Sequence, residues 1–486
     1  MTSATQPIDL NMAPAQTPDN KTLSVVVLAA GQGKRMKSAL PKVLHPLAGK
    51  PMLAHVFAAA AQLFPDKIYV VYGHGGEAVR AAFMDQPLVW IKQDPQLGTG
   101  HAVLQALPQL PSAGITLVLY GDVPLIRAST LAKLVAVAHQ NTLAWLTMTV
   151  ANPEGLGRIL RNHQRQADDA GKGQVIGIIE DKDATDAERT IHEINTGFLA
   201  CPTVLLKKWL PQLDNRNAQG EYYLTDILAL AVAEGCAVQT LSPHAEFEIA
   251  GVNSKEQLAQ LERVFQREKA EHLMSAGVLL IDPARLDVRG ELTTAEDVTI
   301  DVNCIFEGTV HLDARTKIGA NCILRNCKIG AGTEILPFSF IDGAEIGQHA
   351  RIGPYARIRP DTTLADGVHI GNFVEIKASS VGTGSKANHL SYVGDATVGE
   401  NVNIGAGTIT CNYDGANKHR TVIQDNVHIG SDVQLVAPVV VGKGATIAAG
   451  TTVWKDAAAG ELTLNPKIQA TRPDWTRPIK NPRIVI

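Results

Sequence analysis

Residues 25–36 read Val-Val-Val-Leu-Ala-Ala-Gly-Gln-Gly-Lys-Arg-Met, and Leu40-Pro41-Lys42 follows a few positions later. The four apolar residues from Val25 to Leu28 predict a short buried strand, and the small residues after them predict a turn at the edge of an open α/β sheet. Small side chains let backbone N–H groups approach a phosphate, and Lys34, Arg35 and Lys42 add positive charge. The stretch therefore predicts a phosphate-binding turn after a buried strand.

This loop matches neither of two common phosphate-binding signatures. It lacks Gly-x-x-x-x-Gly-Lys-[Ser/Thr], and no third glycine follows Gly31 and Gly33 as in a dinucleotide-binding loop. From the residues alone, a merely structural tight turn stays open. The whole string, with the Pro-Lys that follows it, resembles the signature of sugar-1-phosphate nucleotidylyltransferases. The resemblance implies that the loop holds a nucleoside triphosphate through Leu28, Ala29, Ala30 and Gly31, and that Arg35 and Lys42 are catalytic residues that steady its phosphates.

Composition narrows the class of protein. The 486 residues suffice for two or three domains, and a net charge of −4 gives no basic field for nucleic acid. The six cysteines include no Cys-x-x-Cys pair, so we expect reduced thiols in a cytoplasmic protein and no zinc site. Residues 1–22 are expected to be a disordered extension, since the first 20 hold no Lys or Arg and no apolar core. No run reaches the roughly 18 apolar residues of a membrane span.

Helix-like and strand-like stretches alternate in the first half. Residues 51–63 predict a helix, and residues 67–72 and 115–120 predict strands, so we expect an α/β domain with a mostly parallel sheet. Asp122 falls at the carboxyl end of the second of these strands, the edge where open α/β sheets bind ligands. A carboxylate there suits Mg²⁺, although a simple turn aspartate stays open.

Further strings resemble bacterial N-acetylglucosamine-1-phosphate uridylyltransferase. They include Gln93-Asp94-Pro95-Gln96-Leu97-Gly98-Thr99-Gly100-His101-Ala102, Tyr120-Gly121-Asp122, Gly155-Leu156-Gly157-Arg158, Ile179-Glu180, Glu193-Ile194-Asn195-Thr196-Gly197, Gly220-Glu221-Tyr222-Tyr223-Leu224-Thr225-Asp226 and Gly251-Val252-Asn253. The resemblance implies a Rossmann-like uridylyltransferase domain at residues 23–250. It implies a uracil site at Gln93, Gly98 and Thr99, a UTP site that includes Tyr120 and Gly121, an amino-sugar site at Gly157, Glu180 and Asn195, and Mg²⁺ ligands at Asp122 and Asn253. The polar run at residues 162–174 departs from the family pattern and is expected to be a surface loop.

The chain then changes character. Residues 254–274 have the spacing of an amphipathic helix, within a linker at 251–275. Aliphatic residues next recur about every six positions, at Ile329, Ile335, Ile341, Ile346, Ile352, Ile358, Leu364, Ile370 and Ile376, and again at Ile429, Leu435, Val441, Ile447 and Val453. A period of six predicts a parallel β-helix of hexapeptide repeats, which we place at residues 276–460 as a left-handed helix. The span 298–453 would hold eight to nine triangular coils.

An interruption of the repeat carries the second set of candidate residues. Gly384-Ser385-Lys386-Ala387-Asn388-His389-Leu390-Ser391-Tyr392 resembles the active-site segment of glucosamine-1-phosphate N-acetyltransferase. From the residues alone, His389 can equally be a surface imidazole; the resemblance implies that it is the general base. The resemblance also implies a glucosamine-1-phosphate site at Arg359, Lys377, Tyr392 and Asn403, and an acetyl-CoA groove at Ala406, Asn412, Tyr413, Ser431 and Ala449. Lys467, in the tail at 461–486, stands near the position of the family's coenzyme A-binding arginine.

Taken together, the resemblance implies a bifunctional enzyme of UDP-N-acetylglucosamine synthesis. Acetyl-CoA, glucosamine 1-phosphate and UTP would be its small-molecule substrates, Mg²⁺ its cofactor, and a homotrimer its assembly, with no nucleic acid or membrane partner. Two alternatives stay open. One is another sugar-1-phosphate nucleotidylyltransferase with a non-catalytic β-helix that serves oligomerisation, and the other is a binding or scaffold protein whose sites have decayed.

Overall fold

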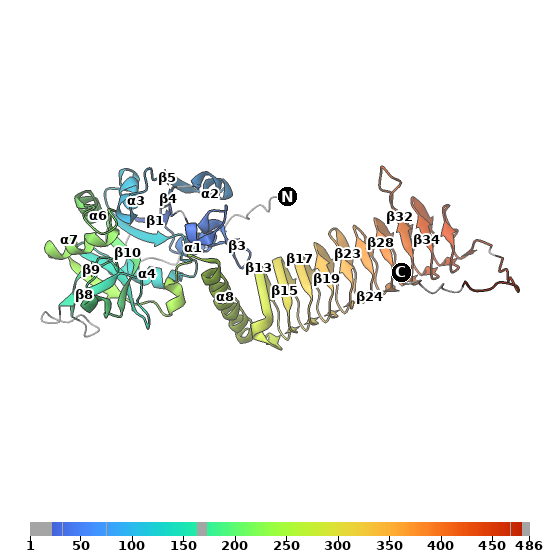
Figure 1. Ribbon diagram of the computed structural model, residues 1–486. Helices are drawn as coiled ribbons and strands as arrows, with labels where there is room; N and C mark the ends of the chain where they lie inside the picture. The colour runs from blue at the N-terminus through green and yellow to red at the C-terminus, as the bar shows by residue number, and fades with distance from the viewer. Residues whose placement is uncertain (1–21, 32, 74, 163–172, 467, 479–486) are drawn as a thin grey trace, which may run out of the picture. The chain divides into compact units, whose positions relative to one another are not determined.

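The computed structural model describes residues 22–31, 33–73, 75–162, 173–466 and 468–478 (Figure 1). They form two compact units that divide between Lys269 and Ala270, inside helix α8 (Lys255–Ser275). The expected helix at residues 254–274 is therefore confirmed to within one residue at each end. Residues 1–21 of the expected N-terminal extension, Lys467 and residues 163–172 of the expected surface loop lie outside the described residues.

The N-terminal unit is built on a sheet whose main path runs β11–β7–β10–β6–β1–β4–β5. These strands are β1 (Leu23–Ala29), β4 (Lys67–Tyr72), β5 (Leu88–Lys92), β6 (Ile115–Tyr120), β7 (Thr142–Thr149), β10 (Glu193–Pro202) and β11 (Ala237–Leu241). Only β10 among them runs antiparallel to its neighbours. A hairpin of β8 (Arg158–Asn162) and β9 (Gln174–Ile179) joins the sheet at β10, and β2 (Pro46–Leu47) pairs separately with β3 (Lys50–Pro51). The predicted α/β domain with a mostly parallel sheet is confirmed.

Helices cover both faces of this sheet because successive side chains of a central strand point to opposite faces. Val25 and Val27 of β1 belong to one apolar core, and Val26 and Leu28 belong to the other. The first core includes side chains of α1 (Met52–Ala61) and α4 (Ala128–Val137), and of the end of α2 (Gly76–Ala82). The second includes side chains of α3 (Thr99–Ala106), α6 (Thr203–Trp209) and α7 (Ile227–Ala233). Helix α5 (Asp186–Arg189) has no buried residue.

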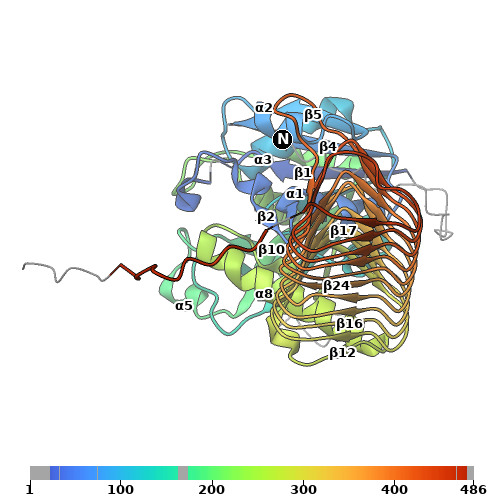
Figure 2. The ribbon, with the colours of Figure 1, turned by 90° about the vertical axis from the view of Figure 1, so that its right-hand side faces the viewer.

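The C-terminal unit is a parallel β-helix whose coils stack in Figure 2. One face is an eleven-stranded sheet, in which every pair is parallel. Its strands are β12 (Leu279–Leu280), β14 (Thr299–Ile300), β16 (Lys317–Ile318), β18 (Glu334–Ile335), β21 (Arg351–Ile352), β24 (His369–Asn372), β27 (Lys386–His389), β30 (Asn403–Ile404), β33 (His428–Ile429), β36 (Thr446–Ile447) and β38 (Leu462–Thr463).

A sixteen-stranded sheet forms the other two faces and is continuous through β17. Its long first strands are β13 (Leu286–Thr294), β15 (Cys304–Leu312) and β17 (Ile323–Ile329). One branch then holds β20 (Ala344–Ile346), β23 (Thr362–Leu364), β26 (Ser380–Val381), β29 (Ala396–Val398), β32 (Thr421–Ile423) and β35 (Val439–Val441). The other holds β19 (Phe340–Asp342), β22 (Arg357–Ile358), β25 (Glu375–Lys377), β28 (Tyr392–Gly394), β31 (Ile409–Cys411), β34 (Gln434–Val436) and β37 (Thr452–Val453).

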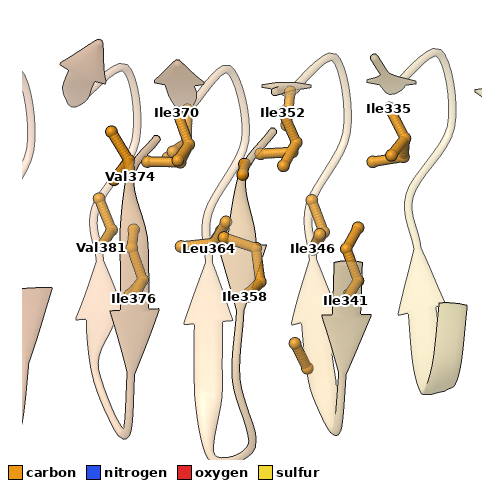
Figure 3. Close-up of a cluster of buried hydrophobic side chains, with 14 of the residues drawn as sticks. Ile335, Ile341, Ile346, Ile352, Ile358, Leu364, Ile370, Val374, Ile376 and Val381 are labelled. Carbon is orange, nitrogen blue, oxygen red and sulfur yellow. The ribbon is translucent and has the colours of Figure 1, made fainter. Parts of the chain in front are cut away.

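The aliphatic residues of the hexads fill the inside of the stack. Ile335, Ile352 and Ile370 pair coil on coil, and Figure 3 shows these side chains turned into one continuous apolar core. The pairings Glu334–Arg351 and Arg351–His369 give steps of 17 and 18 residues, close to three hexads. The predicted eight to nine coils for the span 298–453 agree with the structure, since nine strands of the eleven-stranded sheet, β14 to β36, lie within that span, and β12 and β38 extend the stack beyond it at its two ends.

All six cysteines lie in described parts of the chain and are free thiols. Burial raises the pKa of Cys304 to about 12 and that of Cys322 to about 11, which keeps these thiols protonated. Among the described residues, no helix combines the length and the apolar character that crossing a bilayer requires.

Candidate functional site

The loop after β1 turns back on itself before the first α-helix begins. Gly33 has a φ of +61°, a left-handed backbone conformation that favours glycine. A Cβ placed on Gly33 would also lie 2.7 Å from Cβ of Lys42, which is too close for a larger residue. Two short 3-10 turns, Lys34–Met36 and Lys42–Leu44, then precede α1 at Met52. A Cβ on Gly31 would meet no atom within 4 Å, so the mouth of the loop is open.

A cavity of about 490 Å³ collects most of the predicted UTP site. Its lining includes the predicted residues Leu28, Ala29, Ala30, Gly31, Lys42, Gln93, Gly98, Thr99, Tyr120 and Asp122. Gly121 lies behind this wall, where its N–H donates to the carbonyl of Leu28 at 2.9 Å. The structure therefore brings the glycine loop, the expected uracil segment and the strand end of β6 into one hollow.

Five further residues line the same cavity, namely Lys34, Val43, Gln96, Ala102 and Glu221. Lys34 was expected to add positive charge to the loop, and the other four are absent from the predicted site. Gln96 donates its side-chain amide to the carbonyl of Ala30 and so links the segment 93–102 to the glycine loop. Lys34, Gln96, Ala102 and Glu221 belong to the sequence motifs at residues 25–36, 93–102 and 220–226 from which the site was predicted, so these motifs could have indicated them. Val43 follows Lys42 directly and carries no such signal.

A second cavity of about 340 Å³ is lined by Gly33, Lys34, Arg35, Lys42 and Asn253. Lys34 and Lys42 line both cavities. The ammonium of Lys42 donates to the carboxylate of Asp122 and, at 3.2 Å, to Oδ1 of Asn253. The backbone N–H of Val252 donates to the carbonyl of Asp122 at 2.9 Å, which holds the two predicted metal ligands side by side.

The predicted amino-sugar residues form a neighbouring cluster. A Cβ on Gly157 would lie 3.2 Å from Oε2 of Glu180 and 3.4 Å from Cβ of Asn195. Thr225 donates to Glu180 at 3.1 Å, and burial raises the pKa of the Glu180 carboxyl. Burial, followed by the charge of Glu180, also raises the pKa of Tyr120. Because Tyr120 lines the larger cavity as well, it joins the two clusters.

His389 ends strand β27 on an exposed corner of the β-helix. Nδ1 of His389 lies 2.9 Å from Oδ1 of Asn372, and the two residues pair in register between β24 and β27. The side chain faces solvent and not the dry interior, which suits a group that exchanges protons with a bound substrate. Asn372 is absent from the predicted site; it lies in the hexad region, where nothing in its local sequence marks it.

Successive coils align His389 with three predicted coenzyme A residues. At this corner each coil has a residue of positive φ, in order Phe338, Tyr355, Phe373, Leu390, Gly407, Asp432 and Gly450. Backbone hydrogen bonds connect these corners coil to coil, from Phe373 to Tyr355, Leu390 to Asn372, Gly407 to Leu390, Asp432 to Ala406 and Gly450 to Ser431. His389, Ala406, Ser431 and Ala449 directly precede the last four of these positive-φ residues. The structure therefore stacks these four residues above one another, one per coil, in a column along the corner. In the coils before His389 this corner carries the aromatic residues Phe338, Tyr355 and Phe373. In the coils after it the corner carries the small or polar residues Gly407, Asp432 and Gly450.

A cationic cluster lies on the adjoining face. Contact with the ammonium of Lys418 lowers the pKa of Lys377, and the charge of Arg359 lowers it further. Arg359 is also held by Glu375 at 2.7 Å. Lys418, which was not predicted as a site residue, belongs to a polar loop between β31 (Ile409–Cys411) and β32 (Thr421–Ile423). This loop, here called the excursion, projects beside β32 in Figure 1. The three cations together suit a phosphate.

The remaining predicted residues lie on β28, on β30 and just after β31. Asn412 donates to the hydroxyl of Tyr392 at 3.4 Å and to the carboxylate of Asp395. Tyr413 is 61% exposed at the start of the excursion. Asn403 of β30 pairs with Lys386 of β27, on the strand that carries His389.

The chain matches two family models. Residues 25–221 match the MobA-like NTP transferase domain, and residues 343–378 and 420–453 match the bacterial transferase hexapeptide of six repeats. The first model covers the glycine loop and the lining of the larger cavity, and the second covers coils on both sides of His389.

Relatives of nearly the same length share both units. The chain is 58% identical over 458 residues to a protein of Aromatoleum aromaticum, covering 94% of this chain and 99% of that one. It is 56% identical over 461 residues to a protein of Nitrosospira multiformis, with 95% and 99% covered, and 58% identical over 458 residues to one of an Azoarcus species, with 94% and 100% covered. Each is named bifunctional protein GlmU, and on this similarity, which confirms the resemblance read from the motifs, the chain belongs to the GlmU family of bifunctional proteins.

Proposed function

We propose that this chain makes UDP-N-acetylglucosamine in two steps, one in each unit. The β-helix, with functional bounds at 276–460 and a tail at 461–486, transfers an acetyl group from acetyl-CoA to glucosamine 1-phosphate. The domain at 23–250 then transfers the uridylyl group of UTP to N-acetylglucosamine 1-phosphate and releases pyrophosphate. The linker at 251–275 joins them. The observation that carries the proposal is that each unit holds its own cluster of polar and cationic side chains at a cavity or an exposed corner.

The uridylyl step needs positioning and charge neutralisation more than covalent chemistry. The sugar phosphate attacks the α-phosphorus of UTP, and pyrophosphate leaves. Gln93, Gly98 and Thr99 hold the uracil end of the cavity, the glycine loop holds the triphosphate, and Arg35 and Lys42 neutralise its charge. Gly157, Glu180 and Asn195 orient the amino sugar. Val43, Gln96 and Glu221 complete the walls.

Asp122 and Asn253 would hold a Mg²⁺ ion. The fit rests on one observation: a single cationic group, the ammonium of Lys42, hydrogen-bonds to oxygen atoms of both side chains, so these oxygens converge on one point. Among the described residues there is no cluster of three or more His, Cys, Asp or Glu side chains that suits a metal, and Mg²⁺ commonly takes only one or two carboxylates in such sites. When bound, Mg²⁺ supplies charge neutralisation at the phosphate oxygens.

The acetyl step needs a base for the amine. The carbonyl Oδ1 of Asn372 can only accept a hydrogen bond, so Nδ1 of His389 carries the hydrogen and Nε2 is left with a free lone pair. Nε2 takes a proton from the amine of glucosamine 1-phosphate as the amine nitrogen attacks the thioester carbon of acetyl-CoA. The C–S bond then breaks, and coenzyme A takes up the proton and leaves as the free thiol. Arg359 and Lys377, with Lys418 beside them, hold the sugar phosphate. Tyr392 and Asn403 contact the sugar.

The acetyl-CoA groove follows the column of small corners after His389. Ala406, Ser431 and Ala449 leave room along this corner, and the proposal assigns Asn412 and Tyr413, which follow β31, to the same groove. Lys467, outside the described residues, is assigned to a coenzyme A phosphate.

The assembly is a homotrimer in the cytoplasm. Phe338, Tyr355 and Phe373 support self-association, because they form an exposed stack with ring centroids 4.9 and 5.3 Å apart along the corner that leads to His389. Exposed apolar surface of this kind is typical of protein–protein contacts. Six free thiols support a reducing compartment.

The test supplies the full chain with glucosamine 1-phosphate, acetyl-CoA, UTP and Mg²⁺ and measures free thiol and pyrophosphate. We expect both products, and we expect pyrophosphate to require acetyl-CoA unless N-acetylglucosamine 1-phosphate is supplied. Pyrophosphate without any thiol release would show that the β-helix is not an acetyltransferase.

A further inference from the structure

The ammonium of Lys42 lies at the point on which the two proposed metal ligands converge. It donates to the carboxylate of Asp122 and to Oδ1 of Asn253, the latter at 3.2 Å. The Lys42 side chain is only 10% exposed, and that of Asp122 is 21% exposed. An ammonium and a Mg²⁺ ion both seek oxygen lone pairs, so they compete for the same two atoms.

The two cations exclude each other. Mg²⁺ binds oxygen at about 2.0–2.1 Å, and an ammonium group hydrogen-bonds to oxygen at about 2.7–2.9 Å, so an ion bound to both oxygens would lie within the space that Nζ fills. Repulsion between two positive charges at such a separation adds to the steric conflict. Lys42 must therefore leave before both oxygens can hold the ion.

Lys42 also lies beside the proposed phosphate site. It lines both cavities, and the larger one includes Gly31 and Lys34 at the proposed phosphate site. Its main chain is fixed, because Cβ of Lys42 packs against Gly33 and the 3-10 turn Lys42–Leu44 begins there. The flexible four-carbon stem can carry the ammonium from Asp122 to a triphosphate while the loop stays in place.

We propose that Lys42 is an internal stand-in cation that keeps the metal site closed until a metal–triphosphate complex arrives. This inference rests on the proposed assignment of Asp122 and Asn253 as metal ligands. A Mg²⁺ ion that arrives without nucleotide must break the Lys42–Asp122 ion pair, and the displaced ammonium then has no anionic partner. A metal–triphosphate complex supplies the new partner, so metal and nucleotide enter together.

The test measures Mn²⁺ binding to the full chain without nucleotide, by the loss of the free-ion electron paramagnetic resonance signal. Lys42→Met removes the ammonium and keeps most of the stem, and Lys42→Gln serves as a second variant. Lys34→Met is the matched control, since it removes one positive charge from the same two cavities and leaves Lys42 on Asp122. We expect both Lys42 variants to bind Mn²⁺ about tenfold more tightly than the wild type, and the control to bind as the wild type does. Adding Asp122→Asn to Lys42→Met should abolish the gain.

Three results would overturn the proposal. If the wild type and the Lys42 variants bind Mn²⁺ with equal affinity, Lys42 does not act as a stand-in cation. If Lys34→Met gains as much Mn²⁺ affinity as the Lys42 variants, the gain reflects only the loss of a nearby positive charge. In both cases, Mn²⁺ binding that depends on Asp122 with UTP present would leave the proposed metal site intact. If binding with UTP does not depend on Asp122, the metal site itself fails and the stand-in fails with it. Circular dichroism melting curves verify that each variant is folded.

Discussion

His389 and Asn372 occupy the same corner of adjacent coils, with Nδ1 of the imidazole 2.9 Å from Oδ1 of the amide. The pairing is set by the register of β24 and β27, so the fold and not the local sequence brings the two side chains together. Because the amide oxygen only accepts, it holds the imidazole in the tautomer whose Nε2 can take a proton. Asn372 is thus a positioning residue for the proposed base.

Asn372→Leu should slow acetyl transfer by about tenfold to a hundredfold, since the imidazole then samples both tautomers and other orientations. Asn372→Asp, which keeps an acceptor at the same place, should recover part of the rate. The ¹⁵N resonances of His389 check the cause, because they distinguish the two tautomers. Unchanged resonances in Asn372→Leu would contradict a positioning role, and pyrophosphate release from the same variant serves as the internal control.

Gly98→Ala should damage the uridylyl site. Gly98 has a φ of +107°, and a Cβ there would lie 2.7 Å from the carbonyl oxygen of Tyr222 and 2.9 Å from Cβ of Glu221. We expect a loss of about 2 kcal/mol in unfolding free energy and a higher KM for UTP.

Gly220→Ala is the control for this change. Its φ is +67°, but a Cβ would meet nothing within 4 Å, so only backbone strain of about 1 kcal/mol is expected, with KM unchanged. Urea unfolding and steady-state kinetics measure both variants. An equal effect of the two substitutions would show that the close contact with Tyr222 is unimportant.

Asp226 should make stability depend on pH. Burial, followed by the negative charges of Asp214 and Asp183, raises the pKa of Asp226 to about 6 from an ordinary value of 3.8. The folded state binds this proton more tightly than the unfolded state, so the stability that the neutral carboxyl contributes is present below about pH 4 and is lost as the pH rises through 6.

Asp226→Asn imitates the neutral carboxyl and should stabilise the N-terminal unit by about 1–2 kcal/mol at pH 7, allowing for solvent screening of a partly exposed group. The gain should vanish below about pH 4. Urea unfolding followed by fluorescence of Trp145 and Trp209, both fully buried in that unit, measures it at the two pH values. A gain of the same size at both would contradict the raised pKa.

Tyr355→Asp should break the proposed self-association. Tyr355 is 48% exposed and stacks between Phe338 and Phe373, so a carboxylate there places charge at the centre of the apolar corner. Sedimentation velocity should show a smaller species, with acetyl transfer reduced and uridylyl transfer retained. Met84→Asp, at an isolated side chain that is 74% exposed on the N-terminal unit, is the control and should leave the assembly unchanged.

Regular patterns in the sequence predicted the elements well. The apolar run at residues 115–120 predicted β6 to the residue, and the hexads predicted the buried side chains of the β-helix, because a repeated spacing reports one repeated geometry.

Contacts between distant parts of the chain could not be read in the same way. The hydrogen bond from Lys42 to Asn253 spans 211 positions, and it depends on how the β1 loop meets the segment that follows β11. The column of His389, Ala406, Ser431 and Ala449 depends on coil lengths, one of which is extended by the excursion between Asn403 and His428. Asn372, Lys418 and Val43 could be found only once these registers were known.

The central claim is that one chain carries two separate active sites. The most direct test assays Asp122→Asn and His389→Ala separately, measuring thiol release from acetyl-CoA with glucosamine 1-phosphate, and pyrophosphate release from UTP with N-acetylglucosamine 1-phosphate. The account predicts that Asp122→Asn loses only pyrophosphate release and His389→Ala loses only thiol release, each by at least about a hundredfold. Full thiol release by His389→Ala, or full pyrophosphate release by Asp122→Asn, would contradict it.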